Sequence, residues 1–384
     1  MRNTVICVGA GFSGAVIARQ LALSGFNVIV VDSKSHVAGN CHTKKDINTG
    51  IMLHVYGPHI FHTSNERVWK YIQQFDTIMP FVNRVKAHAR GKVFTLPINL
   101  LTINQLFEKQ FSPSQAKDFI QSIASKNIID PKSFEDQALK FVGREIYETF
   151  FRGYTRKQWG IEPSRLPSSI LKRLPVRFNY DDNYYASSFQ GIPKNGYTYI
   201  IERILDHPNI TLQLSTTYTR DLVKDCNHVF YSGPIDTWFG HCEGRLGYRT
   251  LDFEKIEADG DYQGNAVINY CDEDIPWTRI AEHKHFTPWE QHDKTIVYRE
   301  YSRFCEVGDI PYYPIRLMDD KELLKKYVMM AKNEKKVTFV GRLGTYRYLD
   351  MHITIAEALE VAEKFINSVS DGTSMPSFCV DPLS

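Results

Sequence analysis

The first thirty residues contain two short apolar runs separated by a glycine-rich turn and a helical pattern. Val5–Val8 and Asn27–Val31 are mostly aliphatic, which is typical of buried strands. Between them, Ser13–Ser24 carries its apolar residues at helical spacing. A strand, a helix and a second strand in this order predict a βαβ unit with parallel strands.

Two different patterns follow in the middle of the chain. From about residue 102 to 160 the apolar positions recur at helical spacing, and Ser112 and Ser133 stand where helices would begin. Between Arg245 and Arg303 apolar and polar residues alternate instead, which predicts an antiparallel sheet. The strand-like segments at 82–89 and 92–96 are candidates to join that sheet.

Later segments return to the pattern of the first unit. "NITLQLSTTYTR", "HVFYSGPID" and Val337–Val340 are typical of strands, and Ile353–Val369 is typical of a helix. The first domain is therefore expected to be discontinuous, and the residues after Ser370 are expected to form a loose tail. We expect an α/β fold made of a Rossmann-like FAD-binding domain (1–78, 189–240 and 315–369), an inserted helical bundle (98–172), an antiparallel β-sheet domain (79–97, 173–188 and 241–314) and a C-terminal tail (370–384).

Composition narrows the classes of protein. The 384 residues are 43% hydrophobic and 23% charged, with a net charge of +2, so nothing calls for nucleic acid or an acidic membrane surface. No segment approaches the ~20 apolar residues that span a bilayer, and the N-terminus lacks the features of a signal peptide. The seven cysteines are scattered without a CxxC pair, which predicts neither a disulfide framework nor zinc and favours a cytoplasmic protein.

The glycine-rich turn is the first chemical signal. Gly9, Gly11 and Gly14 form GxGxxG directly after the first strand, the setting in which this motif binds a dinucleotide. Gly9 would make the turn, Gly11 would admit a pyrophosphate and Gly14 would let the helix pack on the strand. Asp32 follows the second strand and would accept hydrogen bonds from a ribose. Because its carboxylate would repel the 2′-phosphate of NADP, NAD or FAD is favoured over NADP.

The discontinuous first domain favours FAD over NAD. An NAD dehydrogenase usually has its nucleotide domain in one block, whereas an FAD fold closes a distant strand–glycine–helix unit on one long cofactor. Gly341 and Arg342 follow the strand at 337–340 and would approach the flavin, with a helix starting near residues 352–354. His59 and His62 lack a third ligand at usable spacing, so no metal is expected.

Aromatic and basic clusters remain outside this cofactor site. Tyr154 and Trp159 stand beside basic residues and would suit the flat ring of a nucleotide base. Arg173 and Arg279, together with tyrosines such as Tyr313, would match a pyrophosphate, because guanidinium groups bind phosphate oxygens at two points. No catalytic triad, activated cysteine or carboxylate pair stands out, so the chemistry would belong to the cofactor.

The same residues carry a specific resemblance. The sequence resembles bacterial UDP-galactopyranose mutases from Val5 to about Val369, with one departure, Ala38 in "AGN", where that family usually has a second glycine. Alanine is small, so we expect little effect. The resemblance rests on "HVYGPHIFHT", "GYTRKQWG", "SILKRLPVRFNYDDNYY", "FQGIPKNGYT", "VFYSGPID", "YRTLDF", "NYCDEDIPWTRIAEHKHF" and "VGRLGTYRYLDM".

The resemblance implies an isomerase that interconverts UDP-galactopyranose and UDP-galactofuranose for cell-surface polysaccharide, with reduced FAD and no net redox change. In the implied mechanism, flavin N5 attacks the sugar C1 and displaces UDP. An iminium adduct then lets the ring open and reclose with five members before UDP returns. We expect a homodimer that binds a UDP-galactose substrate, without membrane insertion.

The resemblance also implies site residues, by matching positions. The diphosphate would be held by Arg173, Arg279, Tyr184, Tyr313 and Tyr348, and the uridine end by Phe150, Phe151, Tyr154, Thr155 and Trp159. Asn83 and Asn269 would lie near the substrate, and His59 would lie beside the flavin and act with Arg173 and Arg279 in catalysis. FAD would be held by Gly9, Gly11, Ser13, Gly14, Asp32, Asn40, His59, Tyr218, Gly341, Arg342, Asp350, Met351 and Thr354. Judged by residue type alone, Phe150 and Phe151 would belong to an ordinary hydrophobic core more readily than to a uridine site.

Two other functions remain open from the sequence. A flavin oxidoreductase of the amine-oxidase type would share the fold but would have no use for diphosphate-binding arginines. A non-catalytic UDP-sugar-binding flavoprotein would bind nucleotide without turnover.

Overall fold

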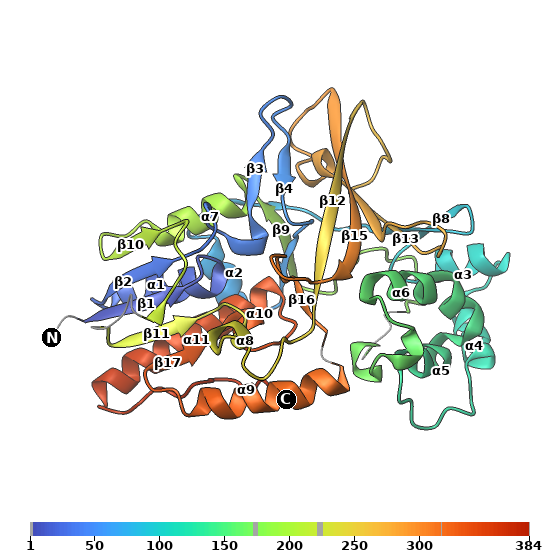
Figure 1. Ribbon diagram of the computed structural model, residues 1–384. Helices are drawn as coiled ribbons and strands as arrows, with labels where there is room; N and C mark the ends of the chain where they lie inside the picture. Colours follow the sequence, from blue (N-terminus) through green and yellow to red (C-terminus); the bar gives the residue numbers. More distant parts are fainter. Residues whose placement is uncertain (1–2, 172–175, 221–225, 316, 384) are drawn as a thin grey trace.

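A five-stranded parallel sheet forms the centre of one lobe (Figure 1). The computed structural model describes residues 3–171, 176–220, 226–315 and 317–383. All four neighbouring pairs of strands run parallel. The strand order is β10 (Ile210–Gln213), β2 (Asn27–Val31), β1 (Thr4–Val8), β11 (His228–Tyr231) and β17 (Val337–Phe339). The sheet therefore combines strands from three distant parts of the chain, as the sequence pattern predicts.

Helices cover both faces of this sheet. Val5 and Cys7 of β1 point to one face, whereas Ile6 between them points to the other, because side chains alternate along a strand. On the first face the core contains residues of α1 (Phe12–Leu23), α7 (Gly196–Leu205) and α11 (Met351–Ser370). On the second face it contains residues of α8 (Ile235–Trp238) and α9 (Met318–Lys332).

A larger sheet of seven strands rises beside the first lobe (Figure 1). Its pairings are antiparallel except one, because β13 and β7 run parallel. The prediction of a purely antiparallel sheet was wrong at this pair, whose strands are far apart in sequence, so no hairpin sets their direction. The order is β16 (Tyr313–Pro314), β12 (Tyr248–Asp259), β15 (Lys294–Phe304), β14 (Arg279–Glu282), β13 (Val267–Tyr270), β7 (Lys86–Ala89) and β8 (Lys92–Thr95).

Smaller elements link the two large sheets. One small sheet pairs β3 (Thr43–Lys45) with β4 (Met52–His54), and another has the order β5 (Phe61–Thr63), β9 (Phe189–Pro193) and β6 (Ile78–Pro80). The first lobe also contains the short helices α2 (Glu66–Ile72) and α10 (Gly341–Gly344) and a 3-10 helical turn (Gly39–Cys41).

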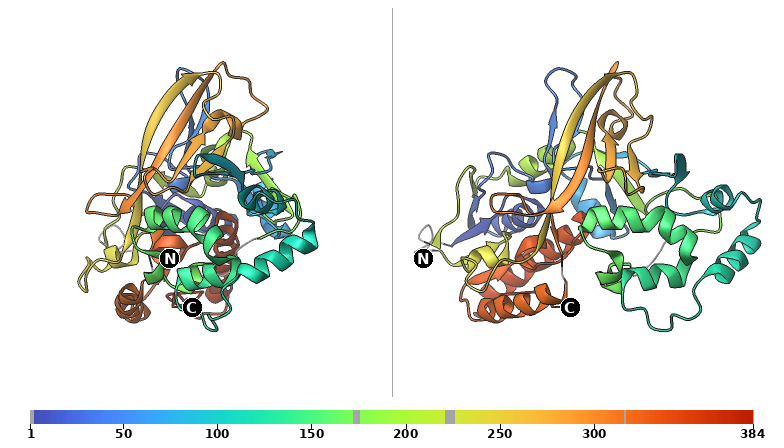
Figure 2. Two further views of the ribbon diagram at one scale, coloured as in Figure 1. Left: turned by 90° about the vertical axis from the view of Figure 1, so that its right-hand side faces the viewer. Right: turned by 45° about the vertical axis from the view of Figure 1, so that its right-hand side comes forward.

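A group of helices lies beside the large sheet, at the opposite end of the molecule from the parallel sheet (Figures 1 and 2). Ser112 and Ser133 cap two of them, as predicted, and each forms a reciprocal capping box with the residue three positions later. The helices are α3 (Leu100–Phe107), α4 (Pro113–Ile123), α5 (Phe134–Ile146), a π-helical turn (Tyr147–Arg152) and α6 (Gly153–Trp159).

The C-terminal segment is not a loose tail, so that prediction was wrong. The N–H of Phe339 in β17 donates to the carbonyl of Ser377 over 2.8 Å. The Thr338 hydroxyl donates to the carbonyl of Pro376 over 2.8 Å. The Phe378 ring also stacks on Phe339, with centroids 5.4 Å apart. This segment therefore covers the edge of β17, which would otherwise be exposed.

All seven cysteines are free thiols, as their spacing predicts. Among the residues that the structure describes, no helix is both long enough and apolar enough to cross a membrane.

Candidate active site

A cavity of about 1520 Å³ opens where the first lobe meets the large sheet. Loops that follow β1, β2, β11 and β17 line one part of it. The carboxyl ends of these parallel strands meet there, which is where open α/β sheets bind ligands. Residues of α6, β14 and β15 line the other part. One continuous space therefore joins the predicted cofactor and substrate regions.

The glycine turns bring the two ends of the chain together. Gly9 has φ +104°, and a Cβ there would lie 2.1 Å from the Ser232 hydroxyl oxygen. Gly341 has φ +71°, and its Cβ would lie 2.5 Å from the Ser13 hydroxyl oxygen. Only glycine fits either position. A Cβ on Gly14 would lie 1.9 Å from the Gly9 carbonyl oxygen, so Gly14 serves the close packing of α1 and does not line the cavity.

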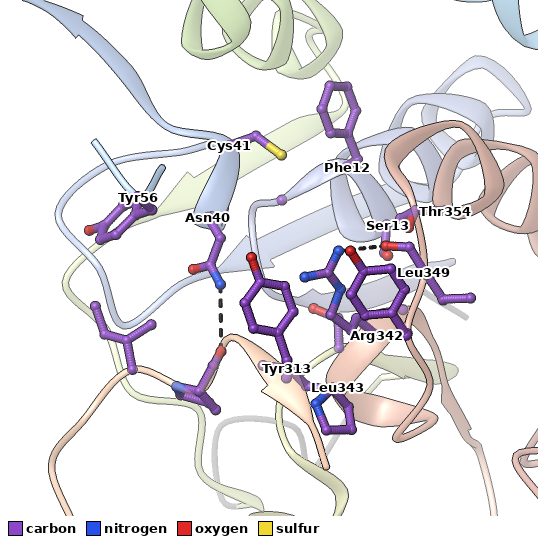
Figure 3. A pocket seen from close by; sticks show the side chains of 18 of the residues that line it. Phe12, Ser13, Asn40, Cys41, Tyr56, Tyr313, Arg342, Leu343, Leu349 and Thr354 are labelled. Atoms are coloured by element: carbon purple, nitrogen blue, oxygen red, sulfur yellow. Dashed lines mark hydrogen bonds between the residues drawn. The ribbon is translucent and has the colours of Figure 1, made fainter. Parts of the chain in front are cut away.

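Asp32 and its neighbours form one end of the cavity. Its carboxylate accepts the N–H of Ala10 over 2.7 Å and the N–H of Lys34 over 2.8 Å. These bonds fix the carboxylate and leave each oxygen a second lone pair for a ribose hydroxyl. The Lys34 ammonium donates to the Asn40 amide oxygen over 3.0 Å, and the Asn40 amide nitrogen contacts the Pro311 carbonyl at 3.5 Å (Figure 3).

Arg342 occupies the middle of the cavity wall. It donates to the carbonyl of Leu349 over 2.6 Å (Figure 3). It also donates to the carbonyl of Tyr312 over 3.1 Å. Its guanidinium carbon also lies 5.4 Å from the Tyr313 ring centre and 5.0 Å from that of Tyr348. These two rings stack with centroids 5.7 Å apart. Arg342 therefore fixes two tyrosines that share the cavity with Arg279.

His59 presents a neutral imidazole to the cavity. Burial, with a smaller effect of the Arg342 and Arg279 charges, lowers the pKa of His59 to about 4. Its Nδ1 lies 2.8 Å from the Gly57 carbonyl, so Nδ1 carries the proton and donates it there. The Nε2 atom is then a hydrogen-bond acceptor.

Arg279 forms an ion pair at the base of the substrate region. It lies directly opposite Glu300 on the neighbouring strand, with 3.0 Å between Nε and the carboxylate. Glu300 is buried, so its charge keeps the guanidinium in place. Burial raises the pKa of Tyr154 and of Tyr313, although the Arg279 charge opposes the shift. Both hydroxyls thus stay protonated and can donate to an anion.

Most of the residues predicted from the sequence line this one cavity. They are Gly9, Gly11, Ser13, Asp32, Asn40, His59, Tyr154, Trp159, Tyr184, Tyr218, Arg279, Tyr313, Gly341, Arg342, Tyr348, Asp350, Met351 and Thr354. Arg173 lies outside the described residues.

Six predicted residues do not line the cavity. Besides Gly14, they are Asn83, Phe150, Phe151, Thr155 and Asn269. The Phe150 ring packs edge-on against Phe94 in the core, with centroids 5.1 Å apart. Asn83, Thr155 and Asn269 are also buried. Phe151 packs against two core clusters of the helical group, so these side chains belong to the protein interior and not to the cavity wall.

Some residues on the wall were not singled out in the sequence. They include Lys34, Tyr56, Tyr185 and Glu300, whereas His62, considered in the sequence only as a metal ligand, also lies on the wall. His62 stacks on Tyr185, with centroids 3.8 Å apart. The His62 Nδ1 lies 3.0 Å from the Ser187 hydroxyl, and the ligand atoms of His62, Asp350 and His352 lie within 4.8 Å of one another. The polar neighbours of His62 therefore come from distant parts of the chain. Tyr56 and Tyr185 stand in two of the quoted motifs, which could have indicated them, whereas Lys34 and Glu300 stand in none of those motifs.

Comparison with known proteins decides the family. A model of the UDP-galactopyranose mutase family matches residues 149–348, and a model of the NAD(P)-binding Rossmann-like domain matches residues 7–75. The chain is 58% identical to a probable UDP-galactopyranose mutase of Klebsiella pneumoniae, over 98% of each chain. It belongs to the UDP-galactopyranose mutase family.

Two other relatives extend this finding. A dTDP-fucopyranose mutase of Escherichia coli is 51% identical over 95% of this chain and 99% of its own. A crystal structure of a reduced UDP-galactopyranose mutase superimposes with a TM-score of 0.72 and 14% identity, over 95% of each chain. Membership of the UDP-galactopyranose mutase family confirms the resemblance and the α/β flavin-binding fold, and it makes this protein a flavin-dependent mutase.

Proposed function

We propose that this protein interconverts UDP-galactopyranose and UDP-galactofuranose with bound FAD in its reduced form. The observation that carries the proposal is the single cavity, in which the glycine loops of a flavin site continue into a pocket with Arg279 and protonated tyrosines. An oxidase acting on an uncharged substrate would have no use for the pocket that contains Arg279 and the protonated tyrosines.

The cavity suits FAD better than a smaller flavin. Its volume of about 1520 Å³ exceeds the ~300–1,000 Å³ of an ordinary small-molecule pocket, so it has room for a dinucleotide and a substrate. We assign the adenosine half to the Gly9–Gly11 turn and Asp32, and the flavin half to Gly341 and Arg342. His59 would accept a hydrogen bond through Nε2 at the flavin end.

The substrate would bind through two kinds of contact. Tyr154 and Trp159 offer rings for the uracil base, and Arg279 offers a guanidinium for the diphosphate. When bound, the reduced flavin supplies the nucleophile for the anomeric carbon of the sugar. Negative charge then develops on the leaving diphosphate, and Arg279 stabilises that charge, helped by the Tyr313 hydroxyl. Arg173, proposed from the sequence, would add a second cation.

The fucose enzyme supports a second candidate substrate. dTDP-fucose differs from UDP-galactose by a methyl group on the base, by the missing 2′-hydroxyl of the pentose and by the missing hydroxyl on sugar C6. The 51% identity to that mutase makes it the alternative to test.

The decisive experiment is a turnover assay on purified holoenzyme. UDP-galactofuranose and dTDP-fucofuranose are each incubated with and without dithionite, and products are separated by chromatography. We expect reduction to switch on formation of UDP-galactopyranose at the higher kcat/KM. Turnover only without dithionite and with oxygen uptake would instead indicate an oxidase, and nucleotide binding without any turnover would indicate a binding protein.

A further inference from the structure

Lys157 of α6 holds the segment that leads into β14. Its ammonium lies within hydrogen-bond distance of four backbone carbonyls: Tyr270 at 2.8 Å, Asp272 at 2.7 Å, Ile275 at 2.8 Å and Trp277 at 3.1 Å. An ammonium has three N–H donors, so these carbonyls satisfy it completely. One side chain thus fixes most of the turn from residue 270 to 277.

That turn connects two strands that carry proposed substrate residues. It joins β13 to β14, and Asn269 and Arg279 lie opposite each other in the register of this pair. The carbonyl of Trp277 is only two residues before Arg279. The position of the Arg279 backbone therefore depends on how the turn is held.

The other side of the contact is the helix that carries the aromatic rings. Tyr154 and Trp159 of α6 line the same cavity as Arg279. The end of α6 is fixed separately, because Arg249 Nε and the Ser302 hydroxyl donate to the Gln158 carbonyl over 3.0 and 2.7 Å. Lys157 thus ties a rigidly held helix to the backbone of the turn before Arg279.

We propose that Lys157 is a positioning residue for nucleotide binding, which sets the separation between the aromatic rings of Tyr154 and Trp159 and the guanidinium of Arg279. This inference rests on the proposed function of those three residues. It predicts a specific defect: without the ammonium, each half of the site stays intact, but the two halves no longer match a ligand that contacts both.

The charge of Lys157 persists at neutral pH. Burial lowers the pKa of Lys157 to about 8, whereas Cys271 and the carboxylates of Asp272, Asp274 and Glu273 oppose the shift. The side chain is therefore protonated at pH 7, where the experiment is done.

The test compares one ligand that spans both halves with two that do not. Dissociation constants for UDP, uridine and inorganic pyrophosphate are measured on holoenzyme at pH 7, for the wild type and Lys157→Met. We expect the Kd of UDP to rise about tenfold, since the gain from linking two contacts depends on their spacing. The Kd values of uridine and pyrophosphate should each change by less than about threefold on the same reasoning.

Two further variants make the test specific. Arg156→Met removes the neighbouring cation of α6, which reaches Glu273 over 2.9 Å but is half exposed, and it should leave all three Kd values within about twofold. Lys157→Arg keeps the charge but cannot fit four converging carbonyls, and it should show the same selective loss of UDP affinity. Lys157→Arg decides the question if Lys157→Met does not fold.

Two results would overturn the inference. One is a UDP affinity in Lys157→Met and Lys157→Arg that stays within twofold of the wild type. The other is a parallel loss of all three ligands, which would make Lys157 a general structural residue. Turnover of UDP-galactofuranose by the reduced wild-type enzyme is measured in a separate assay. A wild type that binds UDP without turnover would refute the proposed function, while the binding ratios would still decide the role of Lys157.

Discussion

At the scale of single residues, Ala38 shows why backbone conformation matters more than side-chain size. It has φ 75° and ψ 0°, the left-handed region that costs a non-glycine residue about 1 kcal/mol or more. Its N–H donates to the Ala10 carbonyl over 2.9 Å, so the conformation is fixed beside the glycine turn. The sequence suggested little effect because alanine is small, but the strain lies in the backbone.

Ala38→Gly should therefore stabilise the protein. We expect the free energy of unfolding to rise by up to about 1 kcal/mol, because the relief of strain exceeds the added entropy of the unfolded chain. Urea unfolding of the wild-type and Ala38→Gly holoenzymes measures this difference in the free energy of unfolding. Gly25→Ala is the opposite control, since Gly25 has φ +87° with open space around its Cβ position, and it should destabilise. A less stable Ala38→Gly would contradict this account.

Arg279→Met should abolish most turnover and keep the flavin. Removing the guanidinium takes away charge stabilisation of the leaving diphosphate and leaves buried Glu300 without its partner. We expect kcat/KM for UDP-galactofuranose to fall by at least about a hundredfold. The flavin absorbance spectrum, measured on the same sample, should be unchanged.

A surface arginine provides the control for that experiment. Arg203 pairs with Asp206 over 3.1 Å and does not line the cavity, so Arg203→Met should keep kcat/KM within about twofold. Near-normal turnover of Arg279→Met would remove Arg279 from the mechanism.

Residue types alone indicated the chemistry of the site but not the direction of each side chain. Sequence motifs and charge predicted Asp32, Arg279 and Arg342 as binding residues, and all three line the cavity. Phe150 does not, because the choice between core and cavity depends on which side of the helix its ring occupies. Glu300 was missed because its role appears only once two strands are paired.

At the scale of elements, Gly143 separates two helical stretches. It has φ +74°, and a Cβ would lie 2.5 Å from the Ile123 carbonyl oxygen of α4. The chain therefore kinks there, inside the range of α5. The sequence predicts separate helical stretches at 133–142 and 144–159, which break at this residue, but apolar spacing does not predict its left-handed conformation.

Gly143→Ala should strongly destabilise the helical group. The backbone cost of about 1 kcal/mol adds to a clash with a carbonyl that cannot easily move, so we expect a loss of about 2–4 kcal/mol. Gly91→Ala is the matched control, because Gly91 has φ +70° with nothing within 4 Å of its Cβ position. Urea unfolding of both variants separates the clash from the backbone cost. Equal losses would mean that the Ile123 contact has no effect.

Pairings between distant elements were the least predictable. The parallel strands near both ends were evident from their apolar runs, since such strands are buried on both faces. The parallel pairing of β13 with β7 was not, because alternation predicts a strand but not its neighbour. The packing of Phe378 on Phe339 was also missed, because a short polar segment after a helix carries no periodic signal.

At the scale of the whole molecule, several buried histidines link stability to pH. Burial lowers the pKa of His228 to about 4 and that of His283 to about 3. His59 behaves in the same way, with a pKa of about 4. All three lie far below the ordinary value near 6.5, so the folded protein keeps these rings neutral in mildly acidic solution.

Acid should therefore weaken the fold well before the carboxylates titrate. Between about pH 6.5 and 4 the unfolded chain binds protons at these rings and the folded chain does not. The free energy of unfolding then falls as pH falls, by up to about 1.4 kcal/mol per histidine per pH unit. His228 is buried and its Nε2 lies 2.9 Å from the Thr338 hydroxyl, so His228→Gln keeps a polar contact while removing one titrating group. Urea unfolding at pH 7, 6 and 5 should give a shallower decline for this variant than for the wild type, and identical slopes would mean that His228 takes up its proton in the folded state.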